Sequence, residues 1–275
     1  MEEALRHHDM DEAKRKHKEI EDYYAEGYLR TWCGTVRESW MRFLHETAKR
    51  INSEMSNIEN EKSFKEVIDI GCGPSPANII SISGMTNVRV VMSDLLSSNR
   101  QSIENFLKEE DTNGNYGDDH SADLMKAFEF VAKLEQGENV GYKDIREILS
   151  RTKESVEAIV ELDISKEIRG DLLGRFDVVI ASLVFDVVCM DKEQFRKVLG
   201  NAVKLLKSDG VILIQGSFDE SLYTVGAKWF PVLNISRDDL YGVIEDCDLK
   251  ICDLKSEKRH SEHYFVALTF QSNKG

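Results

Sequence analysis

The sequence predicts an α/β protein: a three-layer, doubly wound and mainly parallel sheet of seven strands with an antiparallel hairpin at its C-terminal end. Two observations carry this prediction. Short β-rich runs alternate with helical segments over most of the chain, which is the pattern of βαβ units. The last two apolar runs, residues 249–255 and 263–270, have no helix between them, so they should pair as an antiparallel hairpin.

The composition is that of one folded, acidic protein. Of the 275 residues, 41% are hydrophobic, which is enough to bury a sizeable core. The net charge of −14 argues against a nucleic-acid-binding surface. No apolar run approaches the ~18 residues of a membrane span, and the charged start does not resemble a signal peptide. We therefore expect no membrane partner. The five cysteines form no C-x-x-C pair, so we expect a cytoplasmic protein with reduced thiols and no metal site. A monomer is expected rather than an obligate oligomer.

The N-terminal part contains two helical segments of different character. Residues 1–25 are polar with only a thin apolar stripe, so we interpret them as a solvated arm or lid. Residues 34–52 repeat apolar side chains at helical spacing and should face a core. Residues 26–275 are expected to form a single domain, with an acidic helical insertion at about residues 109–157.

Five β-rich runs should form the parallel part of the sheet. In chain order they are residues 66–71, 87–94, 158–164, 176–185 and 211–215. The fourth run is almost wholly apolar, which is typical of a central strand covered on both faces. A turn is predicted at residues 208–210, before the fifth run. The predicted helices that accompany the runs are residues 77–83, 98–109, 192–206 and 237–247.

The first run ends in a glycine turn that predicts a ligand site. Gly71, Cys72 and Gly73 follow the run, and glycine allows a positive φ and a close approach of the backbone to a ligand. Asp94 ends the second run. In doubly wound sheets a carboxylate at this place binds the ribose hydroxyls of an adenosine-containing cofactor. The alternative is a βαβ turn without a nucleotide, in which Asp94 caps a helix.

The glycine pattern also restricts the class of cofactor. The third glycine of the dinucleotide fingerprint is absent, because Ser75 and Pro76 occupy its place. Lys65 is the only Lys or Arg between Phe64 and Val88. Both features disfavour a dinucleotide-dependent oxidoreductase and favour a mononucleoside cofactor without phosphates.

The third and fourth runs should end at the same edge of the sheet. Asp163 and Ile164 end the third run, and the segment from Ser182 to Asp186 ends the fourth. Ligands of open α/β sheets lie outside the carboxyl ends of the strands. An acid beside an apolar residue suits an adenine, whose amino group would meet the acid. A turn cap beside a core residue is the alternative for this pair.

These motifs and two further segments resemble the class I S-adenosylmethionine-dependent methyltransferases, and more narrowly the nicotinamide, phenylethanolamine and indolethylamine N-methyltransferases. The resemblance spans roughly residues 28–270. Its most specific carriers are the Tyr28-Leu29-Arg30 start and the segment from Asp219 to Gly226. It implies a Rossmann-like methyltransferase fold, S-adenosylmethionine as cofactor with S-adenosylhomocysteine as product, and no metal.

The resemblance also implies the residues that hold the cofactor. The glycine turn would approach the sulfonium and the ribose, and acids at strand ends would hold the ribose and the adenine. Cys33 and Ala77 stand where the family has aromatic residues, and both departures concern the lid. The implied cofactor residues are Tyr28, Gly71, Cys72, Gly73, Asp94, Asn99, Asp163, Ile164 and Ser182.

Two acids near strand ends are candidates for binding the acceptor. Asp186 follows the fourth run and Glu220 the fifth, and Tyr223 would add an aromatic wall. A carboxylate can bind an ammonium group and take up the proton that the nitrogen loses before attack. By resemblance, a similar acid pair and tyrosine hold the amine in the phenylethanolamine branch. A turn cap, a solvent-facing acid and a core tyrosine are the structural alternatives.

The class of acceptor depends on one position. By resemblance, the nicotinamide branch binds its amide through an aspartate at the end of strand five, and this chain has Gly216 there. We therefore predict transfer of a methyl group from S-adenosylmethionine to the nitrogen of a small cationic amine by in-line displacement. The alternatives are a nicotinamide or pyridine N-methyltransferase and a catalytically inactive S-adenosylmethionine-binding protein.

Overall fold

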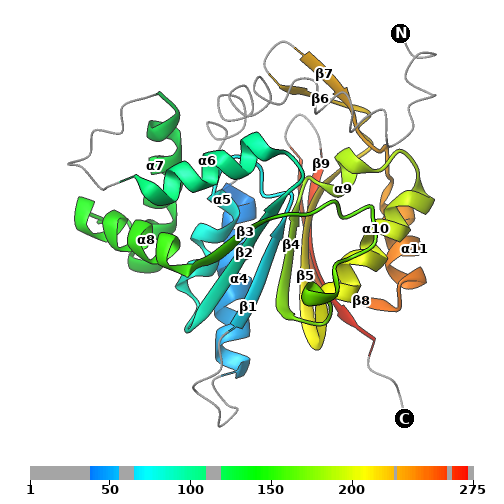
Figure 1. Ribbon diagram of the computed structural model, residues 1–275, viewed down its shortest axis with the longest axis horizontal. Helices are drawn as coiled ribbons and strands as arrows, with labels where there is room; N and C mark the ends of the chain where they lie inside the picture. Colours follow the sequence, from blue (N-terminus) through cyan, green and yellow to red (C-terminus); the bar gives the residue numbers. More distant parts are fainter. Residues whose placement is uncertain (1–37, 56–64, 110–118, 226–227, 259–261, 272–275) are drawn as a thin grey trace. The chain divides into compact units, whose positions relative to one another are not determined.

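The computed structural model describes residues 38–55, 65–109, 119–225, 228–258 and 262–271 (Figure 1). The predicted arm of residues 1–25 and the candidate residue Tyr28 lie outside the described residues. The chain divides into two compact units, with the division between Glu161 and Leu162. The seven strands of the main sheet are divided between these units, which are described in turn.

The first unit contains three parallel strands in the order β3-β2-β1. Their bounds are β1 (Lys65–Ile70), β2 (Val88–Asp94) and β3 (Val156–Glu161). β1 and β3 both pair with β2, so β2 is the middle strand. Helices contact β2, and its consecutive residues Val91 and Met92, whose side chains point to opposite faces, are buried, as expected for a parallel sheet covered on both faces.

The helices of the first unit include the predicted insertion. Within residues 109–157 the structure contains two helices, and Phe128 of one stacks on Phe106 at a ring-centroid distance of 6.3 Å. The insertion therefore shares an apolar core with the preceding helix. The helix predicted over residues 77–83 is split into an α-helix and a 3-10 helix. The bounds are α4 (Glu38–Met55), α5 (Ala77–Ile80), η2 (Ile82–Gly84), α6 (Ser97–Lys108), α7 (Asp119–Gln136) and α8 (Tyr142–Ser155).

The second unit contains four strands of the main sheet in the order β4-β5-β9-β8. Their bounds are β4 (Phe176–Ser182), β5 (Leu206–Phe218), β8 (Leu249–Lys258) and β9 (Glu262–Phe270). β4 and β5 are parallel, whereas β9 is antiparallel to both β5 and β8. The predicted C-terminal hairpin is thus confirmed. The sequence did not predict a second, two-stranded sheet of β6 (Leu222–Val225) and β7 (Lys228–Pro231).

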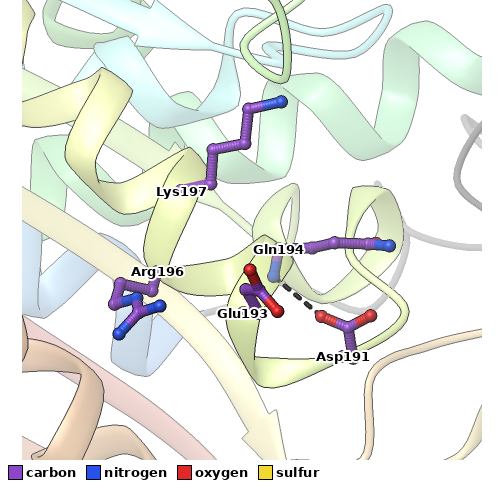
Figure 2. A pocket seen from close by; sticks show the side chains of 5 residues that line it. All are labelled: Asp191, Glu193, Gln194, Arg196 and Lys197. Atoms are coloured by element: carbon purple, nitrogen blue, oxygen red, sulfur yellow. Dashed lines mark hydrogen bonds between the residues drawn. The ribbon is translucent and has the colours of Figure 1, made fainter.

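The helices of the second unit are η3 (Gly170–Leu172), α9 (Phe185–Val188), α10 (Lys192–Leu205) and α11 (Arg237–Asp246). At the start of α10, Asp191 Oδ1 accepts a hydrogen bond of 2.8 Å from the backbone N–H of Gln194 (Figure 2). A surface pocket of about 400 Å³ lies here, and its five lining residues include none of the predicted site residues. Asp191 rather than Asp186 caps α10.

Two helices lead into strands without a connecting loop. α8 ends at Ser155 and β3 begins at Val156, and α10 ends at Leu205 and β5 begins at Leu206. The turn predicted at residues 208–210 lies inside β5, as an irregularity opposite Phe176 and Val178.

Two strands end earlier than predicted, each for a local reason. β3 ends at Glu161 because Asp163 Oδ1 accepts hydrogen bonds from the N–H and hydroxyl of Ser165, which form a turn that competes with the sheet. β4 ends at Ser182 because Leu183 has a φ of 56°, outside the β region. Asp186 therefore lies in α9 rather than at a strand end.

Two types of feature were not found in the described part of the chain. No helix there combines the length and the apolarity of a membrane-spanning helix. Nor does that part contain a cluster of three or more His, Cys, Asp or Glu side chains that could hold a metal ion.

Candidate active site

The glycine turn after β1 has a backbone conformation that favours glycine. Gly71 has a φ of 60° and Gly73 a φ of 66°, a region in which an L side chain costs about 1–2 kcal/mol. Between them, Cys72 is buried and donates its backbone N–H to the carbonyl of Ser93 at 3.0 Å. The turn is therefore fixed to the end of β2.

Asp94 joins this turn to the start of α6. Its Oδ2 accepts the N–H of Gly73 at 2.9 Å, and its Oδ1 accepts the N–H of Leu96 at 2.9 Å. The side chain is buried, and burial raises the pKa of Asp94, while the hydrogen bonds from Leu96, Gly73 and Asn99 oppose that rise. Each carboxylate oxygen has a further lone pair. The carboxylate therefore closes the turn, holds the helix start and can still accept hydrogen bonds from a ligand.

Asn99 supplies a second polar group beside Asp94. The residue is buried in the first turn of α6, and its Oδ1 has no hydrogen-bond partner among the described residues. Buried amide oxygens are almost always satisfied in native proteins, so an exception indicates a missing partner. The accepting oxygens of Asp94 and Asn99 fit a ligand that offers hydroxyl hydrogens, as a ribose does.

A buried chain of hydrogen bonds supports the glycine turn from the side of α4. Trp40 Nε1 donates to Asn78 Oδ1 at 3.1 Å, and Asn78 Nδ2 donates to both carboxylate oxygens of Asp69 at 3.2 Å. The sequence signal for this support is Asp69 itself, an acid within the apolar run that ends at the turn.

The remaining predicted cofactor residues lie in the second unit. Asp163 is half-buried, and its carboxylate is engaged by Ser165, as the turn-cap alternative requires. Ile164 is buried, and its carbonyl accepts Asn201 Nδ2 at 2.8 Å. Ser182 donates its hydroxyl to Gln215 Oε1 at 2.8 Å. Each of these residues is held by its neighbours.

Asp186 is a buried acid of the second unit whose pKa is strongly raised. Its side chain is 2% exposed, and burial raises the pKa of Asp186 to about 7. Oδ2 accepts the backbone N–H of Ser217 at 2.8 Å, which opposes the rise, whereas Oδ1 has no hydrogen-bond partner in the described part of the chain. A buried carboxyl that titrates near neutral pH with one open oxygen is suited to exchange a proton with a ligand.

The other two acceptor candidates lie near the two-stranded sheet of β6 and β7. Glu220 is half-buried in the loop between β5 and β6. Tyr223 lies on β6, and its ring packs against Phe230 at a centroid distance of 5.2 Å.

One short segment after β7 holds the loops of both acids. The N–H of Val232 donates to the carbonyl of Ser221 at 3.1 Å, and the N–H of Leu233 donates to the carbonyl of Asp186 at 2.7 Å. Because Val232 and Leu233 are consecutive, the segment brings the loop that carries Glu220 close to α9, which carries Asp186.

Three residues that neighbour Asp186 or Ser182 were not predicted from the sequence: Ser217, Tyr264 and Gln215. Ser217 fixes Asp186, and Gln215 fixes Ser182. The Tyr264 hydroxyl lies near enough to Asp186 to lower the pKa of its carboxyl, although the two groups do not form a hydrogen bond in the structure. The pairing of β9 with β5 places Tyr264 opposite Gly216, and the sequence carries no signal for that register.

Residues 11–269 match the model of the NNMT/PNMT/TEMT family. The chain belongs to this family. The resemblance stated from the sequence motifs is therefore confirmed.

Two curated relatives indicate what the family contains. Human nicotinamide N-methyltransferase is 25% identical over 187 residues, which cover 67% of this chain and 66% of that enzyme. Human phenylethanolamine N-methyltransferase is 24% identical over 204 residues, which cover 71% of this chain and 66% of that enzyme. The chain thus spans just under two thirds of the length of these relatives.

A solved structure confirms the fold class. The Burkholderia thailandensis 1,6-didemethyltoxoflavin N1-methyltransferase, with bound 1,6-didemethyltoxoflavin and S-adenosylhomocysteine, is similar to this chain with a TM-score of 0.54 at 14% identity. The similarity covers 95% of this chain and 90% of that one. The predicted Rossmann-like methyltransferase fold is therefore confirmed.

Proposed function

We propose that this chain transfers a methyl group from S-adenosylmethionine to the nitrogen of a small cationic amine. Membership of the NNMT/PNMT/TEMT family supports the reaction class, since its relatives are named as N-methyltransferases. The single observation that carries the cofactor assignment is the Asp94 carboxylate. It closes the glycine turn through Gly73 at 2.9 Å and lies beside the unpartnered oxygen of Asn99.

In this proposal Asp94 and Asn99 accept the ribose hydroxyls, and the glycine turn lets the backbone approach the cofactor closely. When bound, S-adenosylmethionine supplies an electrophilic methyl group on its sulfonium. Because the donor is already activated, the protein needs mainly to orient the two partners for in-line attack. The roles of Tyr28, Asp163, Ile164 and Ser182 rest on the family resemblance, as do those of Gly71 and Cys72.

On the acceptor side, Asp186 and Glu220 bind the ammonium form of the amine. Asp186 Oδ1 takes up the proton that the nitrogen must lose before it attacks, which its pKa of about 7 permits near neutral pH. Tyr223 supplies an aromatic wall beside the cation. The absence of a side chain at Gly216 supports an amine acceptor over nicotinamide.

Isothermal titration with S-adenosylhomocysteine tests the cofactor site. Asp94→Ala should weaken binding at least about a hundredfold, because two hydrogen bonds to a charged group contribute roughly 1.5–3 kcal/mol each. The matched control is Glu147→Ala, an exposed acid on α8 whose ion pair with Lys143 should contribute little. An Asp94→Ala protein that binds within threefold of the unaltered chain would contradict the assignment.

Transfer of labelled methyl groups to a panel of amines tests the acceptor site. Asp186→Ala and Glu220→Ala should lose kcat/KM for amines while keeping their affinity for S-adenosylhomocysteine. Binding without any turnover would support the inactive alternative, and a preference for nicotinamide over alkylamines would support the pyridine alternative.

The compartment, the oligomeric state and the N-terminal arm are also part of the proposal. We propose a cytoplasmic monomer without metal, nucleic-acid or membrane partners, consistent with the net charge of −14. Residues 1–25 would act as an arm or lid on a single domain of residues 26–275. Size-exclusion chromatography with light scattering tests the monomer, and deletion of residues 1–25 tests the lid through the affinity for S-adenosylhomocysteine.

A further inference from the structure

Gly216 and Tyr264 occupy a single space in the sheet. They are partners across β5 and β9, and a Cβ atom built at residue 216 would lie 2.7 Å from Tyr264 Cε1 and closer still to the hydroxyl end of the ring. Real Cβ atoms do not approach other atoms so closely. The tyrosine therefore fills the volume that a side chain at residue 216 would require, and the ring can lie there because residue 216 is glycine.

The hydroxyl of Tyr264 is buried, and no residue that the structure describes forms a hydrogen bond with it. The residue is 0% exposed, and its ring packs on Phe218 at a centroid distance of 4.6 Å. Asp186 Oδ1 is likewise buried and unpartnered. Each group changes the pKa of the other, because the hydroxyl lowers that of Asp186, and the Asp186 charge adds to burial in raising that of Tyr264. The geometry agrees, because the hydroxyl overlaps the Cβ position of Gly216, and the next residue, Ser217, donates its backbone N–H to Asp186 Oδ2.

A phenylalanine would fill the same volume without burying a hydroxyl. An unsatisfied buried hydroxyl destabilises a fold, so packing alone does not explain a tyrosine at this position. Asp186 Oδ1 is a group beside it that needs a donor, since Oδ2 is already held by Ser217. Among the described residues, the Cys189 thiol also raises the pKa of Tyr264, and a thiol is only a weak donor or acceptor.

We propose that Tyr264 is a positioning residue for Asp186: its hydroxyl, admitted over Gly216, donates to Oδ1 of the ionised carboxylate and holds it ready for the acceptor amine. This inference rests on the proposed function for its catalytic consequence. It adds a residue from the C-terminal hairpin to the acceptor site. It also couples the two positions, because a side chain at residue 216 would displace the ring of Tyr264.

The test is Tyr264→Phe, which keeps the ring and removes the hydroxyl, with the exposed Tyr142→Phe on α8 as the matched control. The acid limb of the profile of kcat/KM against pH should move about one unit higher, because the charged form of Asp186 loses its donor. The loss of kcat/KM should therefore be about tenfold on the acid side and recover to within about twofold at high pH. Gly216→Ala should produce a similar shift by displacing the ring, with no further shift in the double variant.

A second measurement does not depend on catalysis. The free energy of unfolding changes with pH through Asp186, and this pH-dependent step should also move about one unit higher in Tyr264→Phe. If the unaltered chain methylates no amine, the proposed function fails, while the unfolding data still test the role of Tyr264. An unshifted acid limb and an unshifted step, or an equal loss of activity at every pH, would overturn the inference.

Discussion

Burial of Asp186 should make the free energy of unfolding fall as pH rises toward 7. The isosteric substitution Asp186→Asn should remove this dependence. The carboxyl has an ordinary pKa of 3.8 and a folded-state pKa of about 7, which burial causes. As pH rises from 4 to 7, the unfolded chain releases the proton of residue 186 and the folded chain retains it. The folded state therefore loses stability over this window, because the unfolded state binds fewer protons. In Asp186→Asn nothing titrates at this position.

The magnitude follows from the difference of about three pKa units. Each unit corresponds to about 1.4 kcal/mol, so the full change is about 4 kcal/mol between pH 4 and pH 8. Between pH 5 and pH 7 the free energy of unfolding of the unaltered protein should fall by about 1.4 kcal/mol per pH unit relative to that of Asp186→Asn.

Urea unfolding followed by circular dichroism, at half-unit steps from pH 5 to pH 8, measures this difference. Subtracting the two curves removes the titration of groups that the proteins share. Asp238→Asn, an exposed acid in the first turn of α11, controls for the loss of a carboxyl. If the curves of the unaltered protein and Asp186→Asn run parallel within about 0.5 kcal/mol, the account of Asp186 as a buried acid with a raised pKa is wrong.

Three further substitutions, measured by urea unfolding, test the glycine turn, the hydrogen bond that supports it and the packing of α7. Gly73→Ala should destabilise the protein by about 1–2 kcal/mol, because the position has a positive φ; no loss would contradict the observed turn. Trp40→Phe should cost about 1–3 kcal/mol, because it leaves Asn78 Oδ1 buried without its donor, and an unchanged midpoint would refute the role of that bond. Phe128→Ala should cost about 3–5 kcal/mol if α7 shares the core with Phe106, whereas a loss below about 1 kcal/mol would indicate a loosely attached insertion.

The sequence predicted the elements of the fold well where hydrophobic pattern decides them. The apolar run that begins at Phe176 is a buried parallel strand, and the final pair of runs is an antiparallel hairpin. Boundaries failed where a local hydrogen bond or a dihedral angle ends a strand, as at Asp163 and Leu183. The sheet of β6 and β7 was missed because two four-residue strands are too short for a clear alternation.

The two parts of the candidate site differed in how well they could be predicted. Gly73 and Asp94 were predicted to lie together because they end adjacent parallel strands, and the structure joins them by a hydrogen bond. Tyr264 and Ser217 were not predicted to neighbour Asp186. The position of Tyr264 depends on the register between β5 and β9, which the sequence does not specify.

The direct passage of α8 into β3 and of α10 into β5 has a consequence for how this protein can change in length. A residue deleted from either helix would rotate its remainder by about 100° and would pull the strand one step along its neighbour. One step moves every side chain of the strand to the opposite face of the sheet, and no loop lies at either junction to absorb such a deletion. Viable insertions and deletions in this chain should therefore avoid the junctions at residues 155–156 and 205–206.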